Sequence, residues 1–482
     1  MRGNARIFDE LLQADGETPT PAVRETSMES DGIDRGPYHP SRPPGLRYQG
    51  SDFFARAGMY EPGARGAEVT THEAEILTAA VIAPPTEWHG IAIGRDMLSR
   101  TLVAHDPMTA YQQKRISSPA VMIIGDIGSG KSSLIKTCYV WRTLMFRGRR
   151  VVVVDKKNRA GEGEYSELVR SFGGEPIRIT TEGHGSILNP LDPVITNPSK
   201  TQDRMVGQRV LRTLAEIAGG RQLDEWEDAA LRVAFLATLA DFDAKRRTPI
   251  LGDVVARLGK EPPKGNAASH NAVARERFVL AGVAVAFMLE TLIESYPGLF
   301  DGETSKSVNL DSPLTTFDIS QLPTNGPAVH AAVSLATSWL LGRIQRDNWL
   351  TNFVVEEGWH LMRGPNARAL EENTKLARSF GLAMITAIHK PSDIPAGSPG
   401  RAMFDEAQTV HLFSQARKED IEVTARQFEL GPNQLELLST LPPGQHLLKI
   451  GKRPEIRVEH IRSALEEQLT NTDEAMHLRD EL

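Results

Sequence analysis

The pattern of hydrophobic and polar positions divides the chain into stretches that mix strand and helix signals and one stretch with helical signals alone. Short apolar runs suited to strands buried on both faces are clearest at Val151 to Val154 and at Leu382 to Ile388. Between residues 200 and 300, apolar residues instead recur every three or four positions, which predicts helices. The helices expected there cover residues 205–218, 225–242, 251–258 and 272–296. The pattern therefore predicts an α/β core with an all-α insertion domain.

Strand signals lie on both sides of the helical stretch. They cover residues 90–95, 101–106, 121–124, 151–154, 176–179, 314–319, 352–355, 382–388, 408–413, 446–450 and 455–459. Helical patterns at 133–146, 328–345 and 367–380 separate several of these strands. Strands that alternate with helices in this way favour a mostly parallel sheet flanked by helices.

The two ends of the chain lack such patterns. Residues 1–75 are rich in proline, glycine and charged residues, which predicts a flexible or loosely docked arm. The expected organisation is this arm, a first part of the core at 76–199, the insertion at 200–300, a second part of the core at 301–470 and a frayed tail at 471–482.

A glycine-rich turn joins the strand at 121–124 to the helix that follows. The sequence from Gly125 to Ser132, GDIGSGKS, fits the phosphate-loop pattern G-x-x-x-x-G-K-[ST] without a mismatch. Its glycines allow consecutive N–H groups to approach a polyphosphate at a helix N-terminus, where an anion is favoured. Lys131 is expected to reach the β- and γ-phosphates, and the Ser132 hydroxyl to bind Mg²⁺. We predict that ATP binds to Gly125, Asp126, Ile127, Gly128, Ser129, Gly130, Lys131, Ser132 and Ser133.

A second group of candidate catalytic residues follows later strands. Glu356 and Glu357 come directly after the strand at 352–355. In an NTPase one such carboxylate holds Mg²⁺ through water and its neighbour polarises the attacking water, so we expect these roles for Glu356 and Glu357 respectively. His389, after the strand at 382–388, is expected to sense the γ-phosphate. Arg378 either reaches a nucleotide held by a neighbouring subunit or is a solvated cation at a helix end.

Polar residues also follow the strand at 151–154. They are Asp155, Lys156, Lys157 and the segment from Gly163 to Tyr165. Such residues lie at the carboxyl edge of a parallel sheet, where ligands bind. The alternative is an ordinary charged loop, and the pattern assigns no role to any one of them.

Composition narrows the class of protein. Hydrophobic residues make up 40% and charged residues 24% of the 482 residues, as in soluble globular proteins. A net charge of −7 argues against a surface coated with basic residues, although a local basic groove is compatible with it. The single cysteine, Cys138, is expected to be a small buried residue. The apolar stretch from Phe278 to Leu289 is expected to be too short to cross a bilayer, and the N-terminus lacks a signal peptide, so a cytoplasmic location is expected.

The order of these segments resembles the conjugation and type IV secretion ATPases, the TraC-like branch of the FtsK–HerA group of P-loop motors. The segments that carry the resemblance are GDIGSGKSS, VVVVD, GEY, NPLD, FDIS, VVEEGW, RSFG and ITAIHKPSD. The resemblance implies a RecA-like fold, a homo-hexamer, and ATP hydrolysis with Mg²⁺ that powers a secretion channel or the transfer of DNA or protein. It also implies channel components as partners at the inner face of the membrane.

Three features depart from that family. Glu356 stands where aspartate is common, and His389 stands where glutamine is common. The large N-terminal domain of the family is expected to be absent or reduced. The departures at Glu356 and His389 predict turnover that is slow or differently regulated.

Three functions remain open from the sequence. The first is an ATPase that energises conjugative transfer or type IV secretion. The second is a translocase or coupling protein of the same superfamily that tracks along DNA. The third is a nucleotide-gated scaffold that binds ATP, assembles and hardly hydrolyses it, which the departures at Glu356 and His389 suggest.

Overall fold

A computed structural model describes two short strands near the N-terminus and most of residues 87–470. Within the latter range the description leaves out residues 160, 182–183, 197–204, 246, 324–325, 346–348, 357–380, 392–393 and 395–400. The chain divides into two compact units, Met1–Pro85 and Thr86–Leu482, later than the boundary expected after residue 75. In the first unit, β1 (Leu46–Arg47) pairs antiparallel with β2 (Glu61–Pro62). The rest of the expected arm, and the expected tail at 471–482, lie outside the described residues.

One large sheet forms the centre of the second unit. Its parallel part has the strand order β10-β11-β7-β12-β13-β6-β14. These strands are β10 (Ile177–Arg178), β11 (Leu314–Asp318), β7 (Arg149–Asp155), β12 (Leu350–Val355), β13 (Leu382–Ile388), β6 (Val121–Ile124) and β14 (Thr409–Leu412). Every residue of β7 and β13 is buried, because the sheet is covered on both faces. The expected parallel α/β sheet is therefore confirmed.

The sheet continues beyond β14 with antiparallel pairs. The order is β15-β16-β4-β5, and β3 completes this edge by pairing parallel with β5. These strands are β15 (Gln445–Ile450), β16 (Ile456–His460), β4 (Ala92–Asp96), β5 (Leu102–His105) and β3 (Trp88–His89). Residues from the two ends of the second unit therefore lie in one sheet.

The helical stretch after the glycine-rich turn has three different geometries instead of one continuous α-helix. It consists of α5 (Lys131–Leu134), the π-helix η3 (Ile135–Trp141) and the 3-10 helix η4 (Arg142–Met145). All residues of η3 are buried, and the Asn352 side chain donates a hydrogen bond to the carbonyl of Tyr139 over 3.0 Å. The expected helix at 133–146 is thus only broadly correct, because apolar spacing does not distinguish π from α turns.

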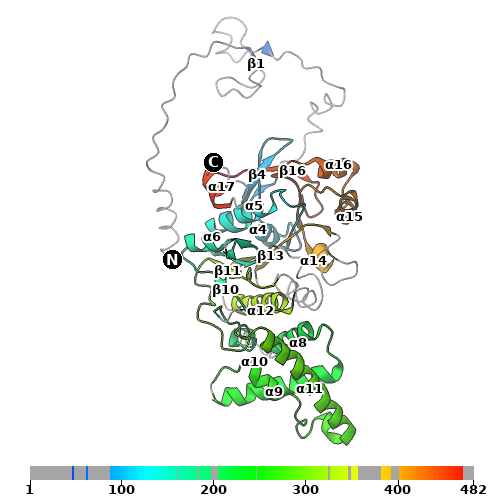
Figure 1. Cartoon of the computed structure of the whole chain (residues 1–482). Helices are drawn as coiled ribbons and strands as arrows, with labels where there is room; N and C mark the ends of the chain where they lie inside the picture. The colour runs from blue at the N-terminus through cyan, green and yellow to red at the C-terminus, as the bar shows by residue number, and fades with distance from the viewer. Residues whose placement is uncertain are drawn as a thin grey trace. The chain divides into compact units, whose positions relative to one another are not determined.

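Shorter helices lie around the sheet (Figure 1). They are α4 (Pro107–Gln112), α6 (Ser166–Ser171), α14 (Arg401–Glu406), α15 (Lys418–Phe428), α16 (Pro432–Thr440) and α17 (Ala464–Thr470).

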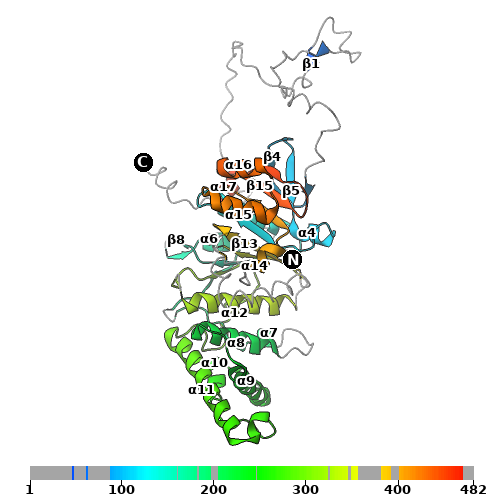
Figure 2. The ribbon, with the colours of Figure 1, turned by 90° about the vertical axis from the view of Figure 1, so that its right-hand side faces the viewer.

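The residues expected to be helical between 200 and 300 form helices. The helices are α8 (Met205–Gly219), α9 (Glu225–Lys245), α10 (Leu251–Val255), the 3-10 helix η5 (Ala267–His270) and α11 (Ala272–Ser295), preceded by α7 (Pro193–Thr196). In both views α12 (Pro327–Ile344) runs between the sheet and these helices (Figures 1 and 2). It contacts α7 and α8, and nearly all of its residues are buried. A helix that is apolar all round is covered on all sides, so α12 joins sheet and helices into one hydrophobic core.

The NPLD segment connects the sheet to the helices. Asn189 is buried; its side chain donates to the carbonyl of Pro249 over 2.9 Å and accepts from the N–H of Leu191 over 3.0 Å. The Asp192 carboxylate accepts from the N–H of Val194 in the first turn of α7 over 2.7 Å. The motif therefore holds the backbone where the chain enters the helical region.

Helix α11 corrects one expectation. Its 24 residues contain a window of mean hydropathy 1.8 that is long and apolar enough to cross a membrane by length and composition, and 33% of that window is buried. The uncharged stretch from Phe278 to Leu289 is shorter than this window because a charged residue lies directly at each of its ends. Core helices of soluble proteins pass the same test, and α11 packs against α8 and α9.

Candidate active site

The register of the parallel strands places four chain segments at one edge of the sheet. Ile388 of β13 pairs with Ile124 of β6, so His389 lies beside Gly125. Val355 of β12 pairs with Val154 of β7, so the residues that follow are Glu356 and Asp155. Because β6, β13, β12 and β7 are consecutive neighbours, the ends of all four strands meet.

The glycine-rich turn has the backbone shape that a phosphate loop requires. Gly128 and Gly130 have φ values of 79° and 106°, in the left-handed region that favours glycine. A Cβ on Gly125 would lie 2.5 Å from the Cβ of Phe413, so a larger residue does not fit there. The Lys131 ammonium donates to the carbonyls of Gly125 and Asp126 over 2.6 and 2.7 Å. Lys131 is therefore held above the loop in which the sequence predicted it to act.

A cavity of about 690 Å³ opens at this edge of the sheet. Four residues predicted to act in catalysis or metal binding line it, namely Lys131, Ser132, Glu356 and His389. Gly128, Gly130, Ile127 and Ser133 of the predicted loop line it as well. The structure thus brings together the predicted phosphate loop, the first acid and the histidine, whereas Glu357 and Arg378 lie outside the described residues.

Glu356 is buried at the wall of this cavity and has a different partner on each carboxylate oxygen. The Ser132 hydroxyl donates to Oε2 over 3.0 Å, and the Tyr165 hydroxyl donates to Oε1. Burial, followed by the nearby charge of Glu356, raises the pKa of Tyr165 well above its usual value. Tyr165 therefore remains a neutral donor that orients the carboxylate.

Lysine and glutamate side chains from the segment after β7 complete the wall. The Lys157 ammonium lies 2.7 Å from Ser132 Oγ and 2.8 Å from Glu356 Oε2. Glu164 forms an ion pair with the buried Lys136 over 2.7 Å and lies 3.5 Å from Lys157. The sequence had indicated this segment as a ligand-binding edge without assigning roles to Lys157, Glu164 or Tyr165.

Arg462 is a further cation in this cavity, and no sequence pattern had indicated it. Its guanidinium donates to Thr470 Oγ1 over 3.2 Å and to Glu467 over 3.4 Å. It follows β16, which enters the sheet through antiparallel pairing. No sequence motif marks such a residue, because the sheet order alone brings it to the phosphate loop.

The donor groups at this site fit ATP and Mg²⁺. The Ser132 hydroxyl and the Glu356 carboxylate, which meet within hydrogen-bond distance, are the oxygen donors that Mg²⁺ prefers. A Cβ on Gly128 would meet no atom within 4 Å, so the loop backbone there is open to a ligand. Lys131 supplies the compact positive charge that β- and γ-phosphates require.

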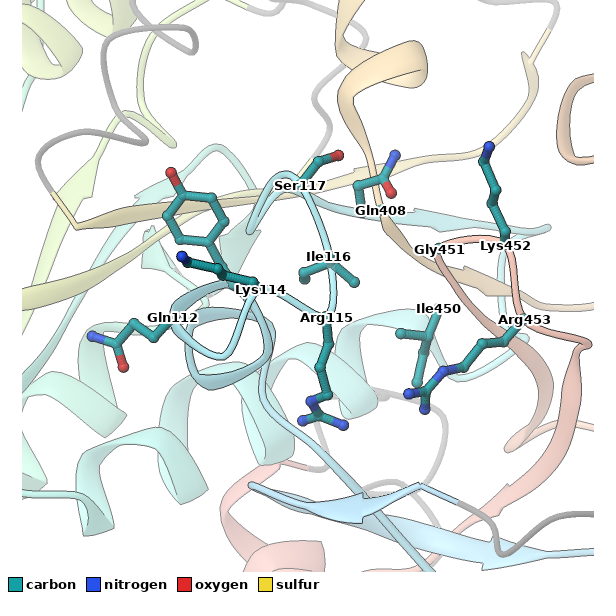
Figure 3. A pocket seen from close by; sticks show the side chains of 11 residues that line it. Gln112, Lys114, Arg115, Ile116, Ser117, Gln408, Ile450, Gly451, Lys452 and Arg453 are labelled. Carbon is teal, nitrogen blue, oxygen red and sulfur yellow. The ribbon is translucent and has the colours of Figure 1, made fainter.

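A second hollow of about 890 Å³ lies between the turn after α4 and the turn after β15. Its lining includes the cations Lys114, Arg115, Lys452 and Arg453, which Figure 3 shows around the central pair Ile116 and Ile450. Behind it, buried Glu87 forms ion pairs with Arg115 and with Arg453, the latter over 2.7 Å. This hollow is a local basic site on an acidic chain.

Comparisons with known proteins show which folds this chain is similar to. Residues 104–322 match the family of AAA-like domains. The structure is similar to that of VirB4 of Thermoanaerobacter pseudethanolicus, with 23% identity over 80% of this chain and 100% of that chain and a TM-score of 0.63. The bacterial conjugative coupling protein TrwB, with 14% identity over 78% of this chain and 90% of that chain, gives a TM-score of 0.49. A search of curated proteins found no match. The similarity to VirB4 shows that the two chains share a fold.

Proposed function

We propose that this chain, which carries an AAA-like domain at residues 104–322 on a RecA-like P-loop fold, is an ATP-hydrolysing motor of conjugation or type IV secretion. The convergence of Lys131, Ser132 and Glu356 in one cavity carries the proposal. VirB4, which shares the fold, and the segments quoted from the sequence support the same family of motors.

Each residue has a defined task in hydrolysis. The loop N–H groups and Lys131 bind the β- and γ-phosphates and compensate their charge. Ser132 and Glu356 would hold Mg²⁺, directly or through water, and the metal would neutralise charge that develops on the phosphate oxygens. Glu357 polarises the attacking water, and His389 donates a hydrogen bond to the γ-phosphate. Tyr165 keeps Glu356 in place by donating to Oε1.

Two substitutions test this function. Lys131→Ala should abolish ATP hydrolysis, because the positive charge opposite the γ-phosphate is lost. Glu357→Gln should bind a non-hydrolysable ATP analogue normally while its turnover falls by about a hundredfold or more, in the range assigned to general bases. Lys418→Ala, which changes a side chain that is 89% exposed, is the matched control.

The outcomes separate the candidate functions. Normal turnover of Glu357→Gln would contradict the role given to that residue. An unsubstituted protein that binds ATP with turnover at background would instead be the nucleotide-gated scaffold.

The assembly and its location follow from the same family. We propose a homo-hexameric ring in which Arg378 of one subunit reaches the nucleotide of the next. Secretion-channel components would hold this ring at the inner, cytoplasmic face of the cell membrane. Mass measurement by light scattering, with and without ATP and Mg²⁺, tests the ring.

A DNA-tracking motor is the second candidate, and the basic hollow favours it. The hollow is lined by four cationic side chains together with glutamine, serine and tyrosine side chains, and groups of all these kinds typically bind phosphate. The cations are Lys114, Arg115, Lys452 and Arg453. Combined Lys114→Gln and Lys452→Gln substitutions should then remove stimulation of the ATPase by DNA and reduce its salt dependence. If DNA does not stimulate the unsubstituted protein at low salt, this candidate is wrong.

A further inference from the structure

We propose that Lys157 acts as a built-in substitute for the metal ion, holding Ser132 and Glu356 until Mg²⁺ arrives with ATP. The inference rests on the proposed function and adds a positioning residue to that site. The Lys157 ammonium would release Oε2 of Glu356 to the metal ion.

The position of the Lys157 ammonium carries the inference. It lies 2.7 Å from Ser132 Oγ and 2.8 Å from Glu356 Oε2. These are the hydroxyl and the carboxylate that would hold Mg²⁺ at a phosphate loop. The ammonium therefore places a positive charge where the metal's charge is required.

The two oxygens of Glu356 have separate tasks. Tyr165 donates to Oε1, while both Ser132 and Lys157 use Oε2. The Tyr165 hydroxyl can keep the carboxylate oriented while the partner of Oε2 is exchanged. The carboxylate thus need not move when a metal ion replaces the ammonium.

Burial explains why a substitute cation is needed. Glu356 is 5% exposed, and a buried carboxylate without a compensating charge is strongly destabilising. Lys157 provides that charge without metal. Once Mg²⁺ is bound, two cations would share one oxygen, and their repulsion would displace the more mobile one.

The displaced ammonium has a place to go. The Lys157 side chain is 35% exposed, and its ammonium lies 3.5 Å from Glu164 Oε2. The other carboxylate oxygen of Glu164, Oε1, pairs with Lys136. Glu164 lines the same cavity and can retain Lys157 after Glu356 is transferred to the metal. The exchange therefore needs only a rotation of one lysine side chain.

This arrangement makes the metal site conditional on nucleotide. Without phosphate oxygens, a metal ion must displace Lys157 with Ser132 and Glu356 as its protein ligands. With ATP, the phosphates supply further ligands and attract Lys157 away from Glu356. Lys157 would thus prevent the site from loading metal before ATP.

Binding of Mn²⁺ without nucleotide tests the inference, measured by electron paramagnetic resonance on the full chain. Lys157→Gln should bind Mn²⁺ roughly tenfold more tightly than the unsubstituted protein, since the competing cation is gone. Its melting temperature should also be lower than that of the unsubstituted protein. Adding Mn²⁺ should raise the melting temperature of Lys157→Gln more than that of the unsubstituted protein. Lys157→Arg, which keeps the charge, should retain weak Mn²⁺ binding.

The matched control is Lys156→Gln. Lys156 donates to the carbonyls of Ser320 and Leu322, so its substitution should leave Mn²⁺ affinity unchanged. Equal Mn²⁺ affinity in Lys157→Gln and the unsubstituted protein would overturn the inference, as would an equal increase in Lys156→Gln.

A measurement on the unsubstituted chain does not depend on variants that fold. Mass spectrometry after amine acylation should show that the reaction rate of Lys157 changes on adding Mn²⁺ and a non-hydrolysable ATP analogue, because its ammonium exchanges partners, while that of Lys156 does not change. Binding of the analogue without a change at Lys157 refutes this inference alone. A chain that does not bind the analogue refutes the proposed function itself.

Discussion

Asp155 and Glu356 follow neighbouring strands, yet their surroundings give them different chemistry. Burial raises the pKa of Asp155 to about 8, although the N–H of Tyr165 donates to it over 2.8 Å. Asp155 is therefore largely protonated at neutral pH. Glu356 differs in having the Lys157 ammonium 2.8 Å from its Oε2. At the residue scale, the nearby Lys157 ammonium therefore distinguishes Glu356, to which we assign the metal, from Asp155.

Tyr165→Phe should reduce kcat/KM for ATP by roughly ten- to a hundredfold, because a hydrogen bond to a charged group is worth about 1.5–3 kcal/mol. The ring stays, so its contact with the Lys136 ammonium at 5.1 Å is kept. Steady-state hydrolysis at several Mg²⁺ concentrations is the measurement. Tyr111→Phe, in the other hollow, is the control. Unchanged kinetics would show that Tyr165 does not position Glu356.

Buried histidines should make the fold sensitive to acid. Burial lowers the pKa of His105 to about 4 and that of His446 to about 3, from a usual value of 6.5. The unfolded chain binds these protons at a higher pH than the folded chain does. The contribution of the two histidines to the free energy of unfolding is therefore fully present above pH 6.5, and it is lost progressively as the pH falls toward their folded-state pKa values. Chemical denaturation across this range should show the loss.

The variant His446→Leu isolates one of these histidines. Neither His446 ring nitrogen has a hydrogen-bond partner in the described part of the chain. We expect a shallower loss of stability on acidification in His446→Leu than in the unsubstituted protein. His89→Gln, whose side chain is 46% exposed, is the control. An identical slope for His446→Leu and the unsubstituted protein would contradict the assignment.

At the scale of elements, α12 decides how the sheet and the helical region meet. Its residues are buried on all sides, and it reaches α7 at Gly342. A Cβ on Gly342 would lie 2.0 Å from the carbonyl oxygen of Val194. The two helices can approach this closely only because one of them has glycine at the contact.

Gly342→Ala should therefore destabilise the chain by about 1–3 kcal/mol through overpacking, despite the better helix propensity of alanine. Gly252→Ala is the matched control, since Gly252 is also in a helix and a Cβ there meets no atom within 4 Å. Denaturant unfolding should show a loss for Gly342→Ala and no loss for Gly252→Ala. Equal effects of the two substitutions would mean that the contact with Val194 is unimportant.

At the scale of the whole molecule, the proposed ring makes each active site depend on two subunits. Lys131, Ser132 and Glu356 come from one chain and line one cavity. Arg378 would come from the next chain around a closed ring with heterologous interfaces. Activity in such an assembly can be restored by mixing two inactive variants.

Mixing Lys131→Ala with Arg378→Ala should recover about a quarter of the unsubstituted ATPase rate, since one junction in four of a randomly mixed ring combines intact partners. Mixing Lys131→Ala with Glu357→Gln should recover none, because both residues are assigned to the same subunit's site. Hydrolysis after subunit exchange is the measurement. Equal recovery in both mixtures would place Arg378 in its own subunit's site.

The sequence by itself determined the parts of the fold that depend on local patterns. Valine-rich runs, spacing of three and four residues, and the GDIGSGKS segment predicted the buried strands, the helical region and the phosphate loop. Each of these signals arises within a few residues, because burial and backbone geometry constrain neighbouring positions directly. The pairing of a phosphate loop with a strand ending in acids also led to Glu356.

Only the tertiary structure decided which distant side chains share the cavity. Lys157 and Arg462 line it from the segments after β7 and β16, and Tyr165 donates to Glu356 from the start of α6. The sequence pattern placed Lys157 and Tyr165 at a ligand-binding edge without giving them partners, and it did not indicate Arg462. A residue far along the chain, Asn352, likewise donates a hydrogen bond to the carbonyl of Tyr139 within η3. Contacts of this kind depend on strand order and register, which are set by the packing of the whole sheet.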